Sequence, residues 1–211
     1  MNKKGSIMDK KELHGNIVVG QSGGPTAAIN ATLAGVIRGG LEGVAAGTVG
    51  KVMGMRNGVE GLLEERLVDL GAMFDSEDKL RRLEHTPAAA LGSCRRKLPR
   101  PQDDPALYEK LLSIFKKYDI RYFFYIGGND SMDTAAKLSE YTRTHDYEMR
   151  IMGVPKTIDN DLVVTDHTPG FGSAAKYIAV TMQELIRDCA VYTVPAVTIV
   201  AIMGRDAGWR T

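Results

Sequence analysis

The chain has 211 residues, of which 44% are hydrophobic and 25% charged, a composition typical of ordinary globular proteins. Its 27 Lys and Arg against 26 Asp and Glu leave a net charge of +1, which argues against bulk binding to nucleic acid or to an anionic membrane. The sequence has no apolar run of roughly 18 residues and no apolar N-terminal signal region, so we expect no membrane span and a cytoplasmic location.

The first predicted unit is a strand, a glycine turn and a helix. Residues 13–20 predict the strand, residues 21–26 (QSGGPT) the turn and residues 27–39 the helix. Gly23 and Gly24 would let a ligand approach the backbone, and free N–H groups at a helix start attract phosphate. A tight turn without a ligand is an equally good interpretation of this segment alone.

The next elements are a strand over residues 47–53, a helix or turn over residues 57–63 and a short helix over residues 75–83. A long connection follows over residues 86–101. It contains the cations Arg95, Arg96, Lys97 and Arg100, with Arg82 just upstream. These cations would form either a phosphate-binding rim or a solvated basic face, and long loops in compact domains are more often functional.

A second strand-turn-helix unit follows. Asp104 and Pro105 predict a helix start, and apolar spacing carries that helix to Lys117. Residues 122–126 predict a buried strand, which ends in the turn 127–131 (GGNDS) before a helix over residues 132–143. Two glycine turns on parallel strands would point their backbone donors at one crevice.

A strand over residues 149–154 leads into the polar segment 155–161, which reads PKTIDND. Pro155 fixes the exit from the strand, and ligands of open α/β sheets bind at the carboxyl ends of strands. On an extended segment, Asp159 and Asp161 lie on the same side, where one carboxylate would take a proton from a hydroxyl while the other orients a metal or holds charge. A polar surface loop is the alternative interpretation.

The last predicted elements are a helix over residues 174–188 and a buried strand over residues 197–202. The alternation of strands and helices predicts an α/β fold with three layers, a mostly parallel, Rossmann-like sheet flanked by helices. We expect an N-terminal tail over residues 1–13 and one lobe over residues 14–211. The chain stops where a further helix would follow, so we expect a truncated lobe.

Four motifs together resemble the phosphofructokinase family. They are residues 22–26 (SGGPT), 127–131 (GGNDS), 155–161 (PKTIDND) and 203–205 (MGR), which occur in the family's order and at similar spacing. The resemblance covers the chain from about residue 14 onward and implies the N-terminal, donor-binding and catalytic lobe of a longer subunit.

The resemblance also implies roles for individual residues. Asp159 would deprotonate the sugar 1-hydroxyl. Asp161 would support this base and the metal, and Thr157 would touch the substrate or the transferred phosphoryl group. Met203, Gly204 and Arg205 would contact the sugar phosphate, with Arg205 also catalytic. The donor side would comprise the following residues: Gly23, Gly24, Arg95, Arg100, Gly128, Asp130, Ser131 and Lys156. Mg2+ is the implied cofactor, with Asp130 as its ligand because Asn129 stands where most members carry an acid.

The donor is implied by two of these positions. ATP-dependent members similar to this chain have glycines where Asp130 and Lys156 stand, which leaves room for the α-phosphate. Here a carboxylate obstructs and repels that phosphate, while Lys156 pairs with a compact diphosphate. The resemblance therefore implies transfer from pyrophosphate to fructose 6-phosphate, by a homo-oligomer in the full-length form. An ATP-dependent kinase or an inactive phosphate-binding fragment is the alternative.

Overall fold

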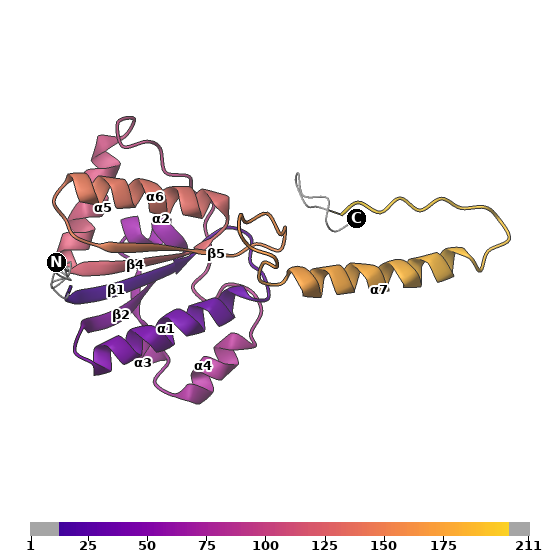
Figure 1. The fold of residues 1–211 in the computed structure, drawn as a ribbon, viewed down its shortest axis with the longest axis horizontal. Helices are drawn as coiled ribbons and strands as arrows, with labels where there is room; N and C mark the ends of the chain where they lie inside the picture. Colours follow the sequence, from indigo (N-terminus) through magenta and orange to yellow (C-terminus); the bar gives the residue numbers. More distant parts are fainter. Residues whose placement is uncertain (1–12, 203–211) are drawn as a thin grey trace, which may run out of the picture.

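The structure, a computed structural model, describes residues 13–202, which include a five-stranded sheet with helices on both faces (Figure 1). The strand order is β3-β2-β1-β4-β5, and only β3 runs antiparallel to its neighbour. The three-layer α/β prediction is therefore confirmed. The strands are β1 (Gly15–Gln21), β2 (Val49–Met55), β3 (Leu67–Asp69), β4 (Ile120–Gly127) and β5 (Arg150–Pro155).

The helices divide between the two faces of the sheet, as Figure 1 shows. On one face lie α2 (Gly58–Leu63), α5 (Pro105–Lys117) and α6 (Asn129–Thr144). On the other lie α1 (Ile29–Ala45), α3 (Leu70–Met73) and α4 (Glu77–Glu84). The last helix, α7 (Phe171–Cys189), projects away from the sheet.

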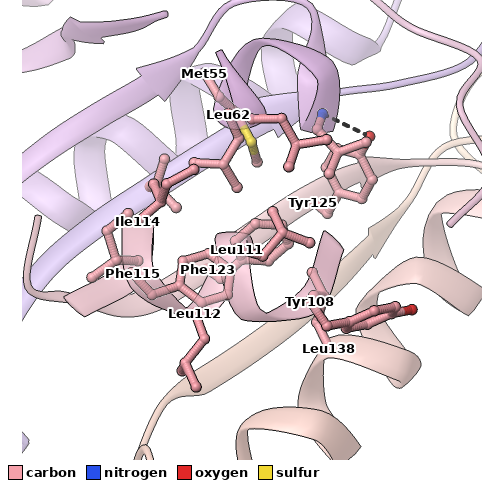
Figure 2. Close-up of a cluster of buried hydrophobic side chains, with 14 of the residues drawn as sticks. Met55, Leu62, Tyr108, Leu111, Leu112, Ile114, Phe115, Phe123, Tyr125 and Leu138 are labelled. Carbon is pink, nitrogen blue, oxygen red and sulfur yellow. Dashed lines mark hydrogen bonds between the residues drawn. The ribbon is translucent and has the colours of Figure 1, made fainter. Parts of the chain in front are cut away.

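Alternation along the strands divides the buried side chains into two cores. In β1, Val18 packs with the α5 side while Val19 packs with the α1 side, because successive strand residues point to opposite faces. On the α5 side, Phe123 meets Phe115 edge to face at 5.9 Å between ring centroids (Figure 2). Each fully buried side chain of this size contributes about 1.5–3 kcal/mol through burial.

Local signals explain most helix boundaries. The Asp104 side chain accepts a hydrogen bond from the Leu107 N–H at 3.1 Å, and Pro105 occupies the first turn of α5, as predicted. Helix α1 continues to Ala45, beyond the predicted end at Gly39. Gly40 lies inside this helix and lets it pack closely on the sheet: a Cβ there would lie 2.8 Å from the Val52 side chain.

Two further parts of the prediction differ from the structure. The short strand β3 and helix α3 were not predicted. The buried strand predicted over residues 197–202 was wrong: this segment has no regular structure, and Val197 and Ile199 are 91% and 90% exposed. A strand needs a neighbouring strand to bond its backbone, and none pairs with residues 197–202 within the described chain.

The order of strands creates a switch point between β1 and β4. The chain leaves β1 through α1 towards β2 on one side, and leaves β4 through α6 towards β5 on the other. Because the two helices lie on opposite faces, the carboxyl ends of β1 and β4 border an open crevice. In parallel α/β sheets, ligands bind at such a point.

Candidate functional site

A hollow of about 130 Å³ lies at this switch point, between the turns that follow β1 and β4. Its lining combines both glycine turns with the basic loop and the residue that follows β5. The lining residues are Ser22, Gly23, Gly24, Cys94, Arg95, Arg96, Gly128, Asn129, Asp130, Ser131 and Lys156. The prediction that both turns face one crevice is confirmed.

Backbone donors at the start of α6 face this region. Gly128 caps the helix without a side-chain hydrogen bond, so the N–H groups of Asn129 and Asp130, which precede Ser131, are the ones that can bind an anion. The turn is tight: a Cβ on Gly127 would lie 2.0 Å from Ser131 Oγ, so only glycine fits there. Ser131 itself is 3% exposed and closes the turn through its N–H to the Gly128 carbonyl at 2.9 Å.

The basic loop is tied directly to the first glycine turn. The Cys94 carbonyl accepts hydrogen bonds from the Gly23 N–H at 2.9 Å and the Ser22 hydroxyl at 3.3 Å. The Ser93 hydroxyl donates to the Gly23 carbonyl, and Gly23 has φ +78°, which favours glycine. Arg95 is thereby held against Gly24, with 3.7 Å between its NH2 atom and a Cβ built there.

Two buried amides fix the other end of the long connection. Gln21 and Asn30 are both 0% exposed and bond to each other, Nε2 to Oδ1, at 2.9 Å. Gln21 Oε1 accepts from the Leu91 N–H, and Asn30 Oδ1 accepts from the Ala90 N–H, each at 2.9 Å. This pair joins the end of β1 and the start of α1 to the loop that carries Arg95.

Tyr125, on β4, supports the same loop through its hydroxyl group. Its hydroxyl accepts from the Val59 N–H at 3.3 Å and lies 3.5 Å from the Cys94 sulfur (Figure 2 shows the bond to Val59). Burial raises the pKa of the Tyr125 hydroxyl well above its usual value, so it remains neutral under ordinary conditions. Gly58 lies against this hydroxyl: a Cβ added to Gly58 would be only 2.8 Å from the Tyr125 oxygen.

Positive charge predominates around the hollow. Arg95, Arg96 and Lys156 line it, and the Lys156 ammonium group donates to the Gly24 carbonyl. The single carboxylate of the lining, Asp130, pairs with Lys97 at 2.9 Å. A compact polyanion would therefore meet cations and backbone donors together.

The polar segment 157–161 starts one residue beyond the hollow. The Lys156 N–H bonds to the Gly127 carbonyl at 2.9 Å and so continues the pairing of β4 with β5. Thr157 Oγ1 accepts from the Asp159 N–H at 3.0 Å and donates to Asp161 Oδ1 at 3.2 Å. One hydroxyl thus links the backbone of one aspartate to the carboxylate of the other.

The structure gathers most of the predicted donor-side residues. Those that line the hollow are Gly23, Gly24, Arg95, Gly128, Asp130, Ser131 and Lys156. Arg100 lies outside the lining, and so do Thr157, Asp159 and Asp161, which follow Lys156 in the chain. Met203, Gly204 and Arg205 lie outside the described residues, so their predicted contacts stay predictions.

The residues that support the site were not predicted from the sequence. Gln21, Asn30 and Tyr125 carry no motif, and only their burial beneath the loops reveals their part. A larger hollow of about 340 Å³ lies between α7 and residues 196–200, but its lining contains no charged side chain and offers no comparable chemistry.

The lining of the hollow offers one carboxylate, that of Asp130, as a metal ligand. Within residues 13–202, no group of three His, Cys, Asp or Glu side chains is placed to hold a metal ion. Mg2+ needs only one or two protein carboxylates when substrate phosphates and waters complete its shell. The lone carboxylate of Asp130 fits that requirement.

Within residues 13–202, no helix has the length and apolar character to cross a bilayer.

An open α/β sheet with glycine turns, cations and a carboxylate-bearing loop at its switch point is the arrangement of domains that bind phosphorylated ligands. Residues 16–211 match the family described as PFK: Phosphofructokinase. The chain therefore belongs to the phosphofructokinase family, as its four motifs predict.

Individual relatives agree with this assignment. The chain is 48% identical over 198 residues to a pyrophosphate--fructose 6-phosphate 1-phosphotransferase of Xanthomonas campestris pv. campestris, covering 93% of this chain and 46% of the relative. A protein of the same name from Methylococcus capsulatus is 43% identical, with 92% and 46% covered.

Among solved structures, the chain resembles a pyrophosphate-dependent phosphofructokinase of Nitrosospira multiformis. The TM-score is 0.75 at 46% identity, and the match covers 83% of this chain and 42% of that one. The chain thus spans about half the length of the curated relatives it matches.

Proposed function

We propose that the protein containing this chain transfers a phosphoryl group from pyrophosphate to the 1-hydroxyl of fructose 6-phosphate, giving fructose 1,6-bisphosphate and phosphate. The observation that carries the proposal is the side-chain pair Asp130 and Lys156 in the lining of one small hollow. The names of the relatives described above support the same donor. Their lengths support a second half that completes the sugar site.

The size and charge of the hollow favour a compact donor. Its volume of about 130 Å³ is well below the roughly 300–1,000 Å³ of pockets that enclose drug-sized ligands. The Asp130 carboxylate would repel the α-phosphate of a nucleotide, whereas Lys156, Arg95 and the start of α6 would bind a diphosphate.

In the proposed mechanism, Asp159 takes the proton of the sugar 1-hydroxyl, whose oxygen attacks one phosphorus of pyrophosphate as the bridging P–O bond breaks. Thr157 and Asp161 hold the segment that carries this base. Arg95 stabilises the charge that develops on the transferring group, and the second phosphate leaves. Mg2+, held by Asp130 and the donor, would neutralise charge on the phosphate oxygens.

Other parts of the proposal rest on family resemblance. Met203, Gly204 and Arg205 would contact the sugar phosphate, and Arg100 would approach the donor from the edge of the site. We also propose a homo-oligomer in the cytoplasm, with no membrane or nucleic-acid partner. Each of these assignments needs the whole protein for its test.

The deciding experiment measures turnover by the whole protein with pyrophosphate and with ATP as donors. We expect activity with pyrophosphate only. Replacing Asp130 and Lys156 together by glycine should lower kcat/KM for pyrophosphate by about 10- to 100-fold, because charged contacts of roughly 1.5–3 kcal/mol are lost. Turnover of the wild-type protein with ATP but not with pyrophosphate would refute the proposed donor.

A separate measurement addresses the chain of residues 1–211 by itself. If it is only the donor-binding lobe, it should bind pyrophosphate in calorimetry and yet transfer nothing to fructose 6-phosphate. The whole enzyme with the Asp159→Asn substitution is the matched control, because it should keep pyrophosphate binding while losing turnover. Equal loss of binding and turnover in that variant would remove Asp159 from the role of base.

A further inference from the structure

We infer that Asn160 is a positioning residue, which fixes the directions of Asp159 and Asp161 by closing the loop that carries them. This inference rests on the proposed function, because it assigns the base to Asp159. Asn160 stands between the two aspartates and is half-buried. The contacts of its side chain lie across the loop rather than towards the hollow.

The backbone at Asn160 is the first observation. Its φ of 55° is left-handed, a conformation that asparagine tolerates better than most residues with a Cβ. This conformation turns the chain sharply between its neighbours. The directions of Asp159 and Asp161 therefore depend on the turn at Asn160.

The amide of Asn160 is the second observation. Its Nδ2 donates to the Asp166 carbonyl at 3.1 Å, and its Oδ1 accepts from the Thr168 N–H at 2.9 Å. The second bond joins residues eight apart in the sequence, so one side chain closes the loop from both of its polar ends. We call these two hydrogen bonds the amide clasp.

The rest of the loop has little packing to hold it. Val163 and Val164 are 89% and 105% exposed, and Val164 has a left-handed φ of 56°, which is unfavourable for a β-branched residue. Close packing occurs at the base of the loop, where a Cβ on Gly170 would lie 2.9 Å from Ile158 Cγ2. The amide clasp thus closes the loop just above this contact.

The clasp also joins the segment to the start of α7. Thr168 is 3% exposed, and its carbonyl accepts from the Phe171 N–H at 3.1 Å as the helix begins. The backbone and these hydrogen bonds therefore connect Asp159 through Asn160 and Thr168 to Phe171. A displacement at the start of α7 would reach the aspartates through the clasp.

The test uses the whole enzyme with Asn160→Gly, which keeps the left-handed backbone accessible while removing both hydrogen bonds. We expect kcat to fall about 10- to 100-fold, as small misplacements of catalytic groups do, with KM for pyrophosphate changed less than about two-fold. Hydrogen–deuterium exchange over residues 157–168 should become about ten-fold faster or more, because two hydrogen bonds are lost and about 1.5 kcal/mol already corresponds to a ten-fold change.

Two further variants separate the clasp from the backbone. Asn160→Ala removes the same hydrogen bonds and also disfavours the left-handed turn, so it should lose more stability than Asn160→Gly with a similar fall in kcat. Asp146→Gly is the matched control: Asp146 is exposed, has a left-handed φ of 51° and lies in the connection from α6 to β5. Its replacement should change neither kcat nor exchange at residues 157–168.

The outcomes separate this inference from the proposed function. Wild-type kcat in Asn160→Gly, or unchanged exchange over residues 157–168, would overturn the role of Asn160. Absence of wild-type turnover with pyrophosphate would instead overturn the proposed function, and the exchange measurement would still decide whether the clasp holds the loop.

Discussion

Helices α1 and α7 are both amphipathic and of similar length, 17 and 19 residues, yet their surroundings differ. Helix α1 packs on the sheet, where Ile29, Leu33 and Ile37 are 0% exposed. Helix α7 buries no residue among those described and projects from the sheet (Figure 1). An apolar face predicts that a helix needs a partner, but it does not identify that partner.

The same contrast separates the two sides of the site. The turns that bind the donor in our proposal rest on buried groups such as Gln21, Asn30 and Tyr125. The loop that carries Asp159 depends on side-chain hydrogen bonds near an exposed surface. The donor side should therefore be rigid in residues 1–211 alone, while the loop and α7 open more easily.

The largest expected difference between the two regions is their susceptibility to proteolysis. Tyr192, 67% exposed beyond α7, should be cleaved by chymotrypsin at least about a thousandfold faster than Tyr108, because cleavage at a fully buried site requires global unfolding of 5 kcal/mol or more. Mass spectrometry of a time course with residues 1–211 measures both rates. Protection of Tyr192 would show that the segment after α7 is packed in solution.

Core substitutions should show the next largest difference. Phe123→Ala should lower the free energy of unfolding by about 3–5 kcal/mol, because Phe123 is 0% exposed in the core shown in Figure 2. Ile186→Ala in α7, where Ile186 is 63% exposed, should change it by less than about 0.5 kcal/mol. Urea unfolding of both variants makes the comparison, and equal effects would contradict it.

The amide pair gives a smaller effect that is specific to the donor side. Gln21→Leu should cost about 1–3 kcal/mol of stability, because the buried Leu91 N–H loses its acceptor and Asn30 Oδ1 keeps only the bond from the Ala90 N–H. Hydrogen–deuterium exchange should speed up at residues 90–97 and remain unchanged at residues 157–168. Faster exchange in both segments would mean that the two sides of the site are not independent.

The smallest expected effect concerns the hydroxyl of Tyr125. Because burial raises its pKa above the usual value near 10, the native protein gains stability below pH 10 that is lost as the pH rises further. Tyr125→Phe should cost about 1 kcal/mol near neutral pH and lose stability less steeply above pH 10. Unfolding measured from pH 8 to pH 11 tests this, and parallel curves for both proteins would exclude the contribution of Tyr125.

Most elements could be predicted because their signals are local. Asp104 and Pro105 define the start of α5, and glycine turns follow the two central strands. The strand β3 was missed because three residues at a sheet edge carry almost no pattern of their own. The end of α1 was placed too early, since Gly40 is there for close packing on Val52 rather than to end the helix.

Within the candidate site, the residues that belong to sequence motifs could be predicted. Gly24, Arg95, Asp130 and Lys156 were predicted from the sequence, and the structure places them around one hollow. Arg100 belongs to the same predicted set but lies outside the lining. Its side-chain direction depends on the path of a long loop, which the sequence does not specify.

The sequence by itself determined the alternation of strands and helices, the two glycine turns and the acidic segment after β5, because each depends on residues close together in the chain. Only the tertiary structure decided that Gln21 and Asn30 join the turn to the basic loop and that Asn160 closes the acidic one. These contacts link groups that are eight to seventy residues apart, and their energies depend on burial and geometry that exist only once the chain has folded.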